Sequence, residues 1–250
     1  MSHEPPWGTV FVDPDADPPA PARIALEQVD KKAFVLGSAI RFTGESGVAG
    51  LPEAALTLRP DDLGPGARTD LASVPAALAW FVGRYGEHTP AVLLHDRLIG
   101  RPGLAGVTEQ DADRFFRYML HALGTPFLRR WLMWAAVAFG TRWRAKGRLR
   151  ALVVAWSVLS LAGMGLFVWA LVTGQWLVAA IAALAPLPAS AMWGKQWGAG
   201  IVAAYSAPWL APPTVLGAIG YYVYRAIEKV LSFIVPDERT QDEPVEYPDF

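Results

Sequence analysis

The chain of 250 residues has a formal net charge of −1, and 53% of its residues are hydrophobic. It contains no cysteine, which excludes disulfide bonds and thiolate metal sites. The near-zero net charge hides an uneven distribution, because charged residues are common up to Arg150 and scarce between Arg150 and Arg225.

The part of the chain before the charge-poor region is expected to hold one small α+β domain. Residues 1–32 are rich in proline and acidic residues, which is typical of a disordered arm. β-type runs at residues 33–42 and 54–59 predict a short β-meander. Glycine and proline in residues 60–68 then predict a loop. The domain as a whole is expected to cover residues 33–142.

Four helices are expected after this loop. The first begins near Pro75, and the second covers residues 89–99 with a proline in its first turn. Thr108 opens the third helix as its N-cap, with Asp111 at the position that completes a capping box. Gly124 ends the third helix, and the fourth follows a proline two residues later.

The charge-poor region predicts an all-α membrane unit over residues 151–235. A run of roughly 18 or more apolar residues is long enough to cross a bilayer, and Lys195 is the only charged residue between Arg150 and Arg225. Prolines predict a kink in the second apolar segment and a broken or re-entrant third segment, so the unit has two or three spans. The three segments are residues 151–173, 176–193 and 201–224.

A basic juxtamembrane segment, residues 143–150, precedes the first span. Because basic residues gather on the cytoplasmic side of spans, the N-terminal domain is expected in the cytoplasm of a multi-pass bacterial inner-membrane protein. Anionic lipid headgroups are the expected partners of the basic cluster, and no nucleic-acid partner is expected. The cluster consists of Arg142, Arg144, Lys146, Arg148 and Arg150. Residues 236–250 form an acidic tail that is expected to be disordered.

The polar residues that could carry chemistry lie in the predicted α+β domain. Asp70 and Ser73 stand near the first predicted helix, His95 and Asp96 in the second, and Asp113 in the third. One hypothesis is a divalent metal (Zn, Mn or Mg) bound by His95, Asp113 and Asp70. Another is His95 as a general base oriented by a carboxylate, with Ser73 or a water molecule as nucleophile. All five residues are therefore candidates for a catalytic site.

A purely structural role is also open for these residues. Asp70 and Ser73 are well placed to cap the helix that follows them. Neighbouring residues on a helix point about 100° apart, so His95 and Asp96 do not easily face one metal ion. The aspartates of the second and third helices could instead form buried ion pairs with Arg68, Arg97 or Arg117.

Four segments of the domain carry a resemblance to a known family. They are RTDLASVP (68–75), AVLLHDRL (91–98), DADRFFRYML (111–120) and WLMWAAVAFG (131–140). In this order they resemble DUF1353, a family of unknown function from bacteria and phages, over about residues 33–142. Ala67 and Arg68 stand where that family usually has Gly-Phe, and Ile99 stands where it often has an aromatic residue. The resemblance implies a small α+β domain with its Thr-Asp, His-Asp and Asp elements clustered in one site, and it implies no reaction.

Three functions are open at this stage. The first is a membrane-tethered protein with a cytoplasmic DUF1353-like domain that binds or scaffolds other molecules. The second is a membrane-associated hydrolase that uses the His/Asp cluster with or without a divalent metal. The third is a small phage-type membrane or lytic protein. The third function is disfavoured because Lys195 is the only charged residue across the predicted spans. Transport pathways usually need several polar groups within the spans.

Overall fold

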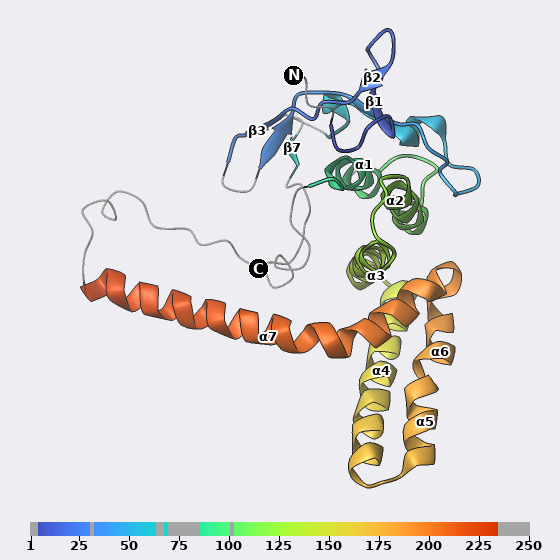
Figure 1. Ribbon diagram of the computed structural model, residues 1–250, viewed down its shortest axis with the longest axis vertical. Helices are drawn as coiled ribbons and strands as arrows, with labels where there is room; N and C mark the ends of the chain where they lie inside the picture. The colour runs from blue at the N-terminus through green and yellow to red at the C-terminus, as the bar shows by residue number, and fades with distance from the viewer. Residues whose placement is uncertain (1–4, 31–32, 64–67, 70–85, 101–102, 235–250) are drawn as a thin grey trace. The chain divides into compact units, whose positions relative to one another are not determined.

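The computed structural model describes residues 5–30, 33–63, 68–69, 86–100 and 103–234 (Figure 1). The chain divides into two compact units. The first contains residues 1–73 and 84–206, and the second contains residues 74–83 and 207–250. The strands, the first helices and the helical hairpin all belong to the first unit.

Short antiparallel strands form two sheets in the N-terminal part of the described chain. The orders are β2-β1-β5-β6 and β3-β4-β7. Each strand is two or three residues long and pairs antiparallel with its neighbours. The strands are β1 (Phe11–Asp13), β2 (Ala20–Pro21), β3 (Leu26–Gln28), β4 (Phe34–Leu36), β5 (Ile40–Phe42), β6 (Thr57–Leu58) and β7 (Arg68–Thr69).

The N-terminal arm predicted to be disordered contributes β1 and β2 to the first sheet and β3 to the second, which corrects that prediction for its described residues. Phe11 is fully buried, and its ring lies 5.3 Å from the ring of Phe42, measured between centroids. Phe42 in turn contacts Phe115 at 5.4 Å. The indole N–H of Trp7 donates to the carbonyl of Ala22 across 2.7 Å. Burial of these apolar side chains holds the arm in place despite its prolines and acidic residues.

The second β-type run is only partly a strand. A 3-10 helix, η1 (Glu53–Leu56), occupies its first half, and β6 occupies Thr57–Leu58. The predicted loop after it contains a second 3-10 helix, η2 (Pro60–Leu63). The predicted helix near Pro75 lies outside the described residues.

The other three predicted helices of the domain are present as α1 (Thr89–Ile99), α2 (Glu109–Ala122) and α3 (Phe127–Arg144). The side chain of Thr108 caps α2 by accepting from the backbone N–H of Asp111. Gly124 follows α2 with a φ of 70°, which an L residue with a side chain rarely adopts. The inner face of α2 buries Phe115, Phe116, Met119 and Leu120.

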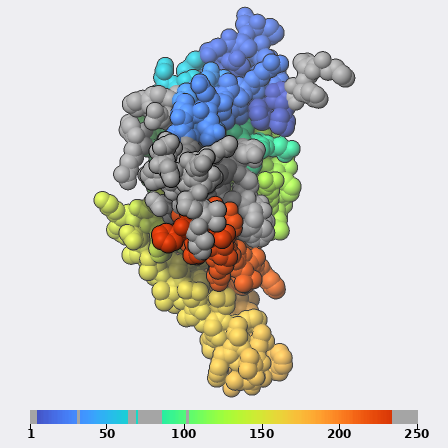
Figure 2. Space-filling model, turned by 90° about the vertical axis from the view of Figure 1, so that its left-hand side faces the viewer, coloured from blue at the N-terminus to red at the C-terminus, as the bar shows by residue number. Residues whose placement is uncertain are grey.

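A long helical hairpin follows α3. Helix α4 (Arg148–Val172) runs to a tight turn and is followed by α5 (Trp176–Leu184), α6 (Pro186–Ala189) and the 3-10 helix η4 (Ser190–Gln196). The predicted kink is present, since the second apolar segment is divided among these three elements. The turn between α4 and α5 lies far from the strands of the same unit, and the two helices run side by side (Figures 1 and 2).

Helix α7 (Trp197–Ile234) passes through Pro208, Pro212 and Pro213 as one continuous helix. The structure therefore has neither the broken nor the re-entrant third segment that the prolines suggested. Two helical stretches, Arg148–Val172 and Trp176–Phe233, are long and apolar enough to cross a membrane, judged by length and composition.

A core rich in tryptophan joins α3 to the hairpin within the first unit. The ring centroids of Trp156 on α4 and Trp193 on η4 are 5.0 Å apart. The sequence-predicted boundary at residue 142 therefore falls inside a continuous core. Its buried members are Trp134, Ala135, Ala138, Val153, Trp156, Trp193 and Ala199.

Candidate polar site

Asp113 is the centre of a buried hydrogen-bonded cluster that draws on three parts of the chain. His95 Nε2 on α1 lies 2.9 Å from Asp113 Oδ1. The hydroxyl of Thr141 on α3 donates to the same oxygen across 3.1 Å. Gln196 Nε2, at the end of η4, donates to Asp113 Oδ2 across 3.3 Å. A carboxylate accepts hydrogen bonds and cannot donate them, so the His95 tautomer that suits this contact carries its hydrogen on Nε2.

Arg142 extends this cluster toward the hairpin. Its guanidinium donates to the side-chain oxygen of Gln196 and to the backbone carbonyl of Trp193, the latter across 2.8 Å. The guanidinium also lies over the Trp193 ring, 4.6 Å from its centroid. Burial lowers the pKa of Arg142 from its ordinary value, and the charge of Asp113 opposes that shift.

The cluster is closed to solvent. Asp113 is 0% exposed, Gln196 is 0% exposed and His95 is 4% exposed. A buried carboxylate is costly unless hydrogen bonds replace its water, and here both oxygens of Asp113 have partners. The local sequence explains the burial, because the Ala91–Leu94 run and the apolar face of α2 carry His95 and Asp113 into the core.

Two of the five predicted site residues meet directly, namely His95 and Asp113. Asp96 Oδ1 lies 4.0 Å from His95 Nδ1, at the edge of ion-pair distance, and its side chain is 25% exposed. Asp70 and Ser73 lie outside the described residues. Among the described residues, no group of three His, Cys, Asp or Glu side chains could hold a metal ion. The metal hypothesis therefore depends on Asp70.

Arg97 and Arg117, two of the three arginines suggested as partners of the aspartates, have other contacts in the structure. The side chain of the third, Arg68, lies outside the described residues. Arg97 Nη2 lies 3.1 Å from Asp62, and the same guanidinium also donates to backbone carbonyls of the η1–β6 segment. Arg117 lies over the rings of Trp134 and Trp131 at 4.2 and 4.9 Å from their centroids. Both arginines thus support packing elsewhere, and Asp113 has uncharged donors and a histidine instead.

Sequence reasoning missed Thr141 and Gln196, and it gave Arg142 a different role. Arg142 is 2% exposed, so it does not belong to the predicted lipid-facing cluster. Gln196 had a usable signal, because an uncharged polar side chain in a long apolar region needs a hydrogen-bond partner. Nothing in the sequence alone names that partner.

A match to a known family overlaps the part of the chain that carries His95 and Asp113. Residues 62–137 match the model of DUF1353, described as a protein of unknown function. The predicted family is thereby confirmed, although the match begins after β6 rather than at residue 33. His95 and Asp113 lie inside the DUF1353 match, whereas Arg142 and Gln196 lie beyond it. No curated protein and no solved structure matches the chain.

Proposed function

We propose that the chain is a multi-pass protein of the bacterial inner membrane, and that its DUF1353 domain lies in the cytoplasm and binds or scaffolds another molecule. The exposed surface of the hairpin carries this proposal. Leu161 on α4 is 63% exposed and Leu177 on α5 is 75% exposed, within a row of large apolar side chains along both helices. Such a surface is unfavourable in water and is accommodated by lipid tails.

The contact between α4 and α5 has the character of packing between membrane helices. The residues buried there are small, including Ala170, Ala179 and Ala182. An added Cβ at Gly163 would be in ordinary van der Waals contact, 3.8 Å from the Cβ of Ala185, so small residues face each other at this position. Small residues at a helix contact allow close approach where no hydrophobic driving force exists, as in lipid.

Exposed basic residues near the start of α4 support a cytoplasmic domain. Arg144, Lys146, Arg148 and Arg150 are all exposed, so they remain available to anionic lipid headgroups. Trp143, 47% exposed, lies beside them, with the Arg150 guanidinium 5.9 Å from its ring centroid. An indole beside arginines is a usual arrangement at a membrane surface.

The closure of the polar cluster favours binding or scaffolding over catalysis. A catalytic group must reach its substrate, and Asp113 has no exposed surface. We infer that the cluster is structural, since its hydrogen bonds hold α1, α2, α3 and η4 together. In this account it fixes the orientation of the DUF1353 domain on the hairpin.

A membrane-associated hydrolase is the second candidate, and the His95–Asp113 pair is the observation that favours it. A carboxylate bound to one ring nitrogen orients a histidine that acts as a base through the other. His95 Nδ1 faces the side of partly exposed Asp96. In this alternative Asp70, Ser73 and a divalent metal would take part in the reaction. The phage-type lytic role stays a prediction.

Alkaline extraction of membranes tests the proposed location. We expect the full chain to stay in the membrane pellet, and we expect replacement of Leu161 and Leu177 together by arginine to release it, because each buried charge opposes insertion. Glu109→Arg, an exposed change in the domain, is the control and should leave the chain in the pellet. Release of the unmodified chain would refute membrane insertion.

A further inference from the structure

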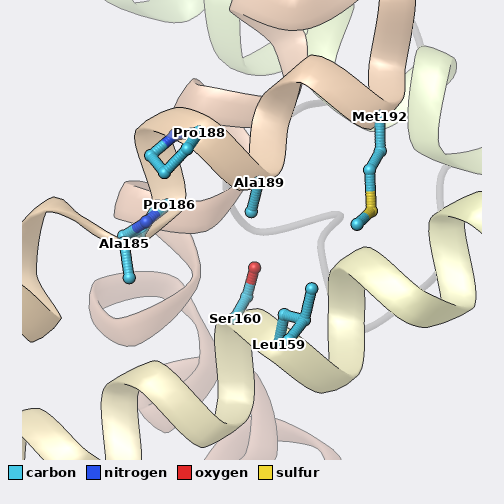
Figure 3. A pocket seen from close by; sticks show the side chains of 7 residues that line it. All are labelled: Leu159, Ser160, Ala185, Pro186, Pro188, Ala189 and Met192. Carbon is cyan, nitrogen blue, oxygen red and sulfur yellow. The ribbon is translucent and has the colours of Figure 1, made fainter.

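A pocket of about 340 Å³ lies between α4 and the segment from α5 to η4 and is partly open to the surface of the hairpin (Figure 3). Its volume falls at the lower end of the range for small-ligand pockets, about 300–1,000 Å³. No lining residue is charged, so a ligand would have to be neutral. The lining residues are Leu159, Ser160, Ala185, Pro186, Pro188, Ala189 and Met192.

Ser160 is the only one of these residues whose side chain can donate a hydrogen bond. Its hydroxyl points from α4 into the pocket, toward Ala189 (Figure 3). Ser160 Oγ is buried and has no hydrogen-bond partner among the described residues. A buried hydroxyl without a partner is costly, so its presence calls for an acceptor.

Other hydroxyls of the hairpin behave differently. Ser157 donates to the carbonyl of Val153 across 2.8 Å, and Thr173 donates to that of Trp169 across 2.9 Å. Ser190 donates to the carbonyl of Pro186 across 2.7 Å. Each of these bonds reaches four residues back, which is the usual choice of such side chains in helices. Ser160 faces the pocket instead.

The depth of Ser160 in the proposed membrane limits the source of the acceptor. Ser160 lies twelve residues after Arg148, or about 18 Å along the helix at 1.5 Å per residue. The hydrocarbon core is about 30 Å thick, so this position is near its middle. Ester groups of phospholipids lie at the edges of that core. The acceptor therefore belongs to a molecule that dissolves within the core.

We propose that the pocket binds a neutral lipophilic carbonyl compound from the bilayer, whose carbonyl oxygen accepts a hydrogen bond from Ser160 Oγ. The apolar body of the ligand would contact Leu159 and Met192. This inference rests on the proposed membrane location and adds a ligand site to it.

An alkyl benzophenone is the probe for this site, because it is neutral and lipophilic and carries a carbonyl. On irradiation its carbonyl takes a hydrogen atom from a nearby C–H bond. The two carbon radicals then join, and the carbonyl becomes a hydroxyl. With the full chain in lipid nanodiscs, we expect the label on the segments containing Leu159 and Met192. An excess of a long-chain ketone should suppress the label, and an alkane of equal length should not.

Matched variants separate the hydroxyl from the pocket. Ser160→Ala should weaken labelling about fivefold, the effect of one lost hydrogen bond, and Ser157→Ala should leave it unchanged. Ala189→Trp should abolish labelling by filling the pocket, whereas Ala162→Trp on the exposed surface should not. Even labelling along the hairpin, equal competition by the alkane, or an unchanged Ser160→Ala variant would overturn the proposal.

Alkaline extraction of the same samples separates failure of the ligand site from failure of the proposed membrane location. A chain that stays in the membrane but is labelled evenly contradicts the ligand site alone. A chain that extraction releases contradicts the proposed membrane location, and the ligand site with it.

Discussion

Gln196 Nε2 donates to Asp113 Oδ2 across 3.3 Å, although 83 positions separate the two residues in the chain. Asp113 lies within the DUF1353 match, and Gln196 lies at the end of η4. The same Gln196 side chain accepts from Arg142 and donates to the carbonyl of Gln110. One amide thus connects α2, α3 and η4, so the domain is built onto the hairpin rather than attached through a flexible segment.

Gln196→Ala should lower the free energy of unfolding by about 1–3 kcal/mol, because it leaves the buried Arg142 and Asp113 each short of a hydrogen bond. Urea unfolding of the purified chain in detergent measures this change. Gln175→Ala is the control, since Gln175 is exposed at the hairpin turn. Equal effects of the two substitutions would contradict a special role for Gln196.

Arg142→Lys should also destabilise the chain, by about 1–3 kcal/mol, because an ammonium group cannot reproduce the planar guanidinium fork that meets Gln196 and Trp193. Arg144→Lys changes an exposed arginine two residues later and should have almost no effect. Thermal unfolding of both variants in the same detergent gives the comparison. The prediction fails if the exposed position proves the more sensitive.

Gly47→Ala should disturb the contact between the N-terminal sheet region and α2. An added Cβ would lie 2.2 Å from the ring of Tyr118, and the φ of Gly47 is +60°. Gly50 has a φ of +76° with open space around it, so Gly50→Ala carries backbone strain without the clash. We expect Gly50→Ala to lower the free energy of unfolding by about 1–2 kcal/mol. Gly47→Ala should lower it by a clearly larger amount. Similar losses in chemical unfolding would count against the Tyr118 contact.

Asp15 and Arg59 predict a small acid dependence of stability. The hydrogen bond from Arg59 lowers the pKa of the Asp15 carboxyl below its ordinary value. A lowered folded-state pKa stabilises the fold above the unfolded pKa, near 4, and that contribution is lost as the pH falls through the folded pKa. Asp15→Asn should therefore flatten stability between about pH 5 and pH 2.

Because both Asp15 and Arg59 are exposed, high salt should reduce the difference in acid dependence of stability between the unmodified chain and the Asp15→Asn variant. Asp17→Asn changes the net charge equally and is the control, since Asp17 is also exposed. Identical pH profiles for the two variants would show that the pair with Arg59 contributes nothing.

The helices of the domain were predictable because their ends are encoded locally. Thr108 as N-cap and Gly124 after the last turn are short-range signals, and both are used as expected. The strands of the N-terminal arm were not predictable in this way. Phe11 is held by Phe42, thirty-one residues away, and the prolines around Phe11 conceal that contact. Pairing between distant segments outweighs local composition there.

The candidate site was predictable only in part, for a related reason. Burial beside apolar residues singled out His95 and Asp113, because polar groups in such positions need partners. The partners Thr141 and Gln196 come from elements whose approach depends on the tertiary fold. The basic pattern likewise could not separate Arg142, which turns inward, from exposed Arg144.

Single-cysteine labelling tests the central claim most directly, because the natural chain has no cysteine. Glu109→Cys reports on the region that matches DUF1353, and Gln175→Cys reports on the hairpin turn, both at exposed positions. A membrane-impermeant maleimide should label Gln175→Cys in intact spheroplasts and Glu109→Cys only in inverted vesicles. Labelling of both cysteines from the same side would contradict a hairpin that crosses the membrane and carries a cytoplasmic domain.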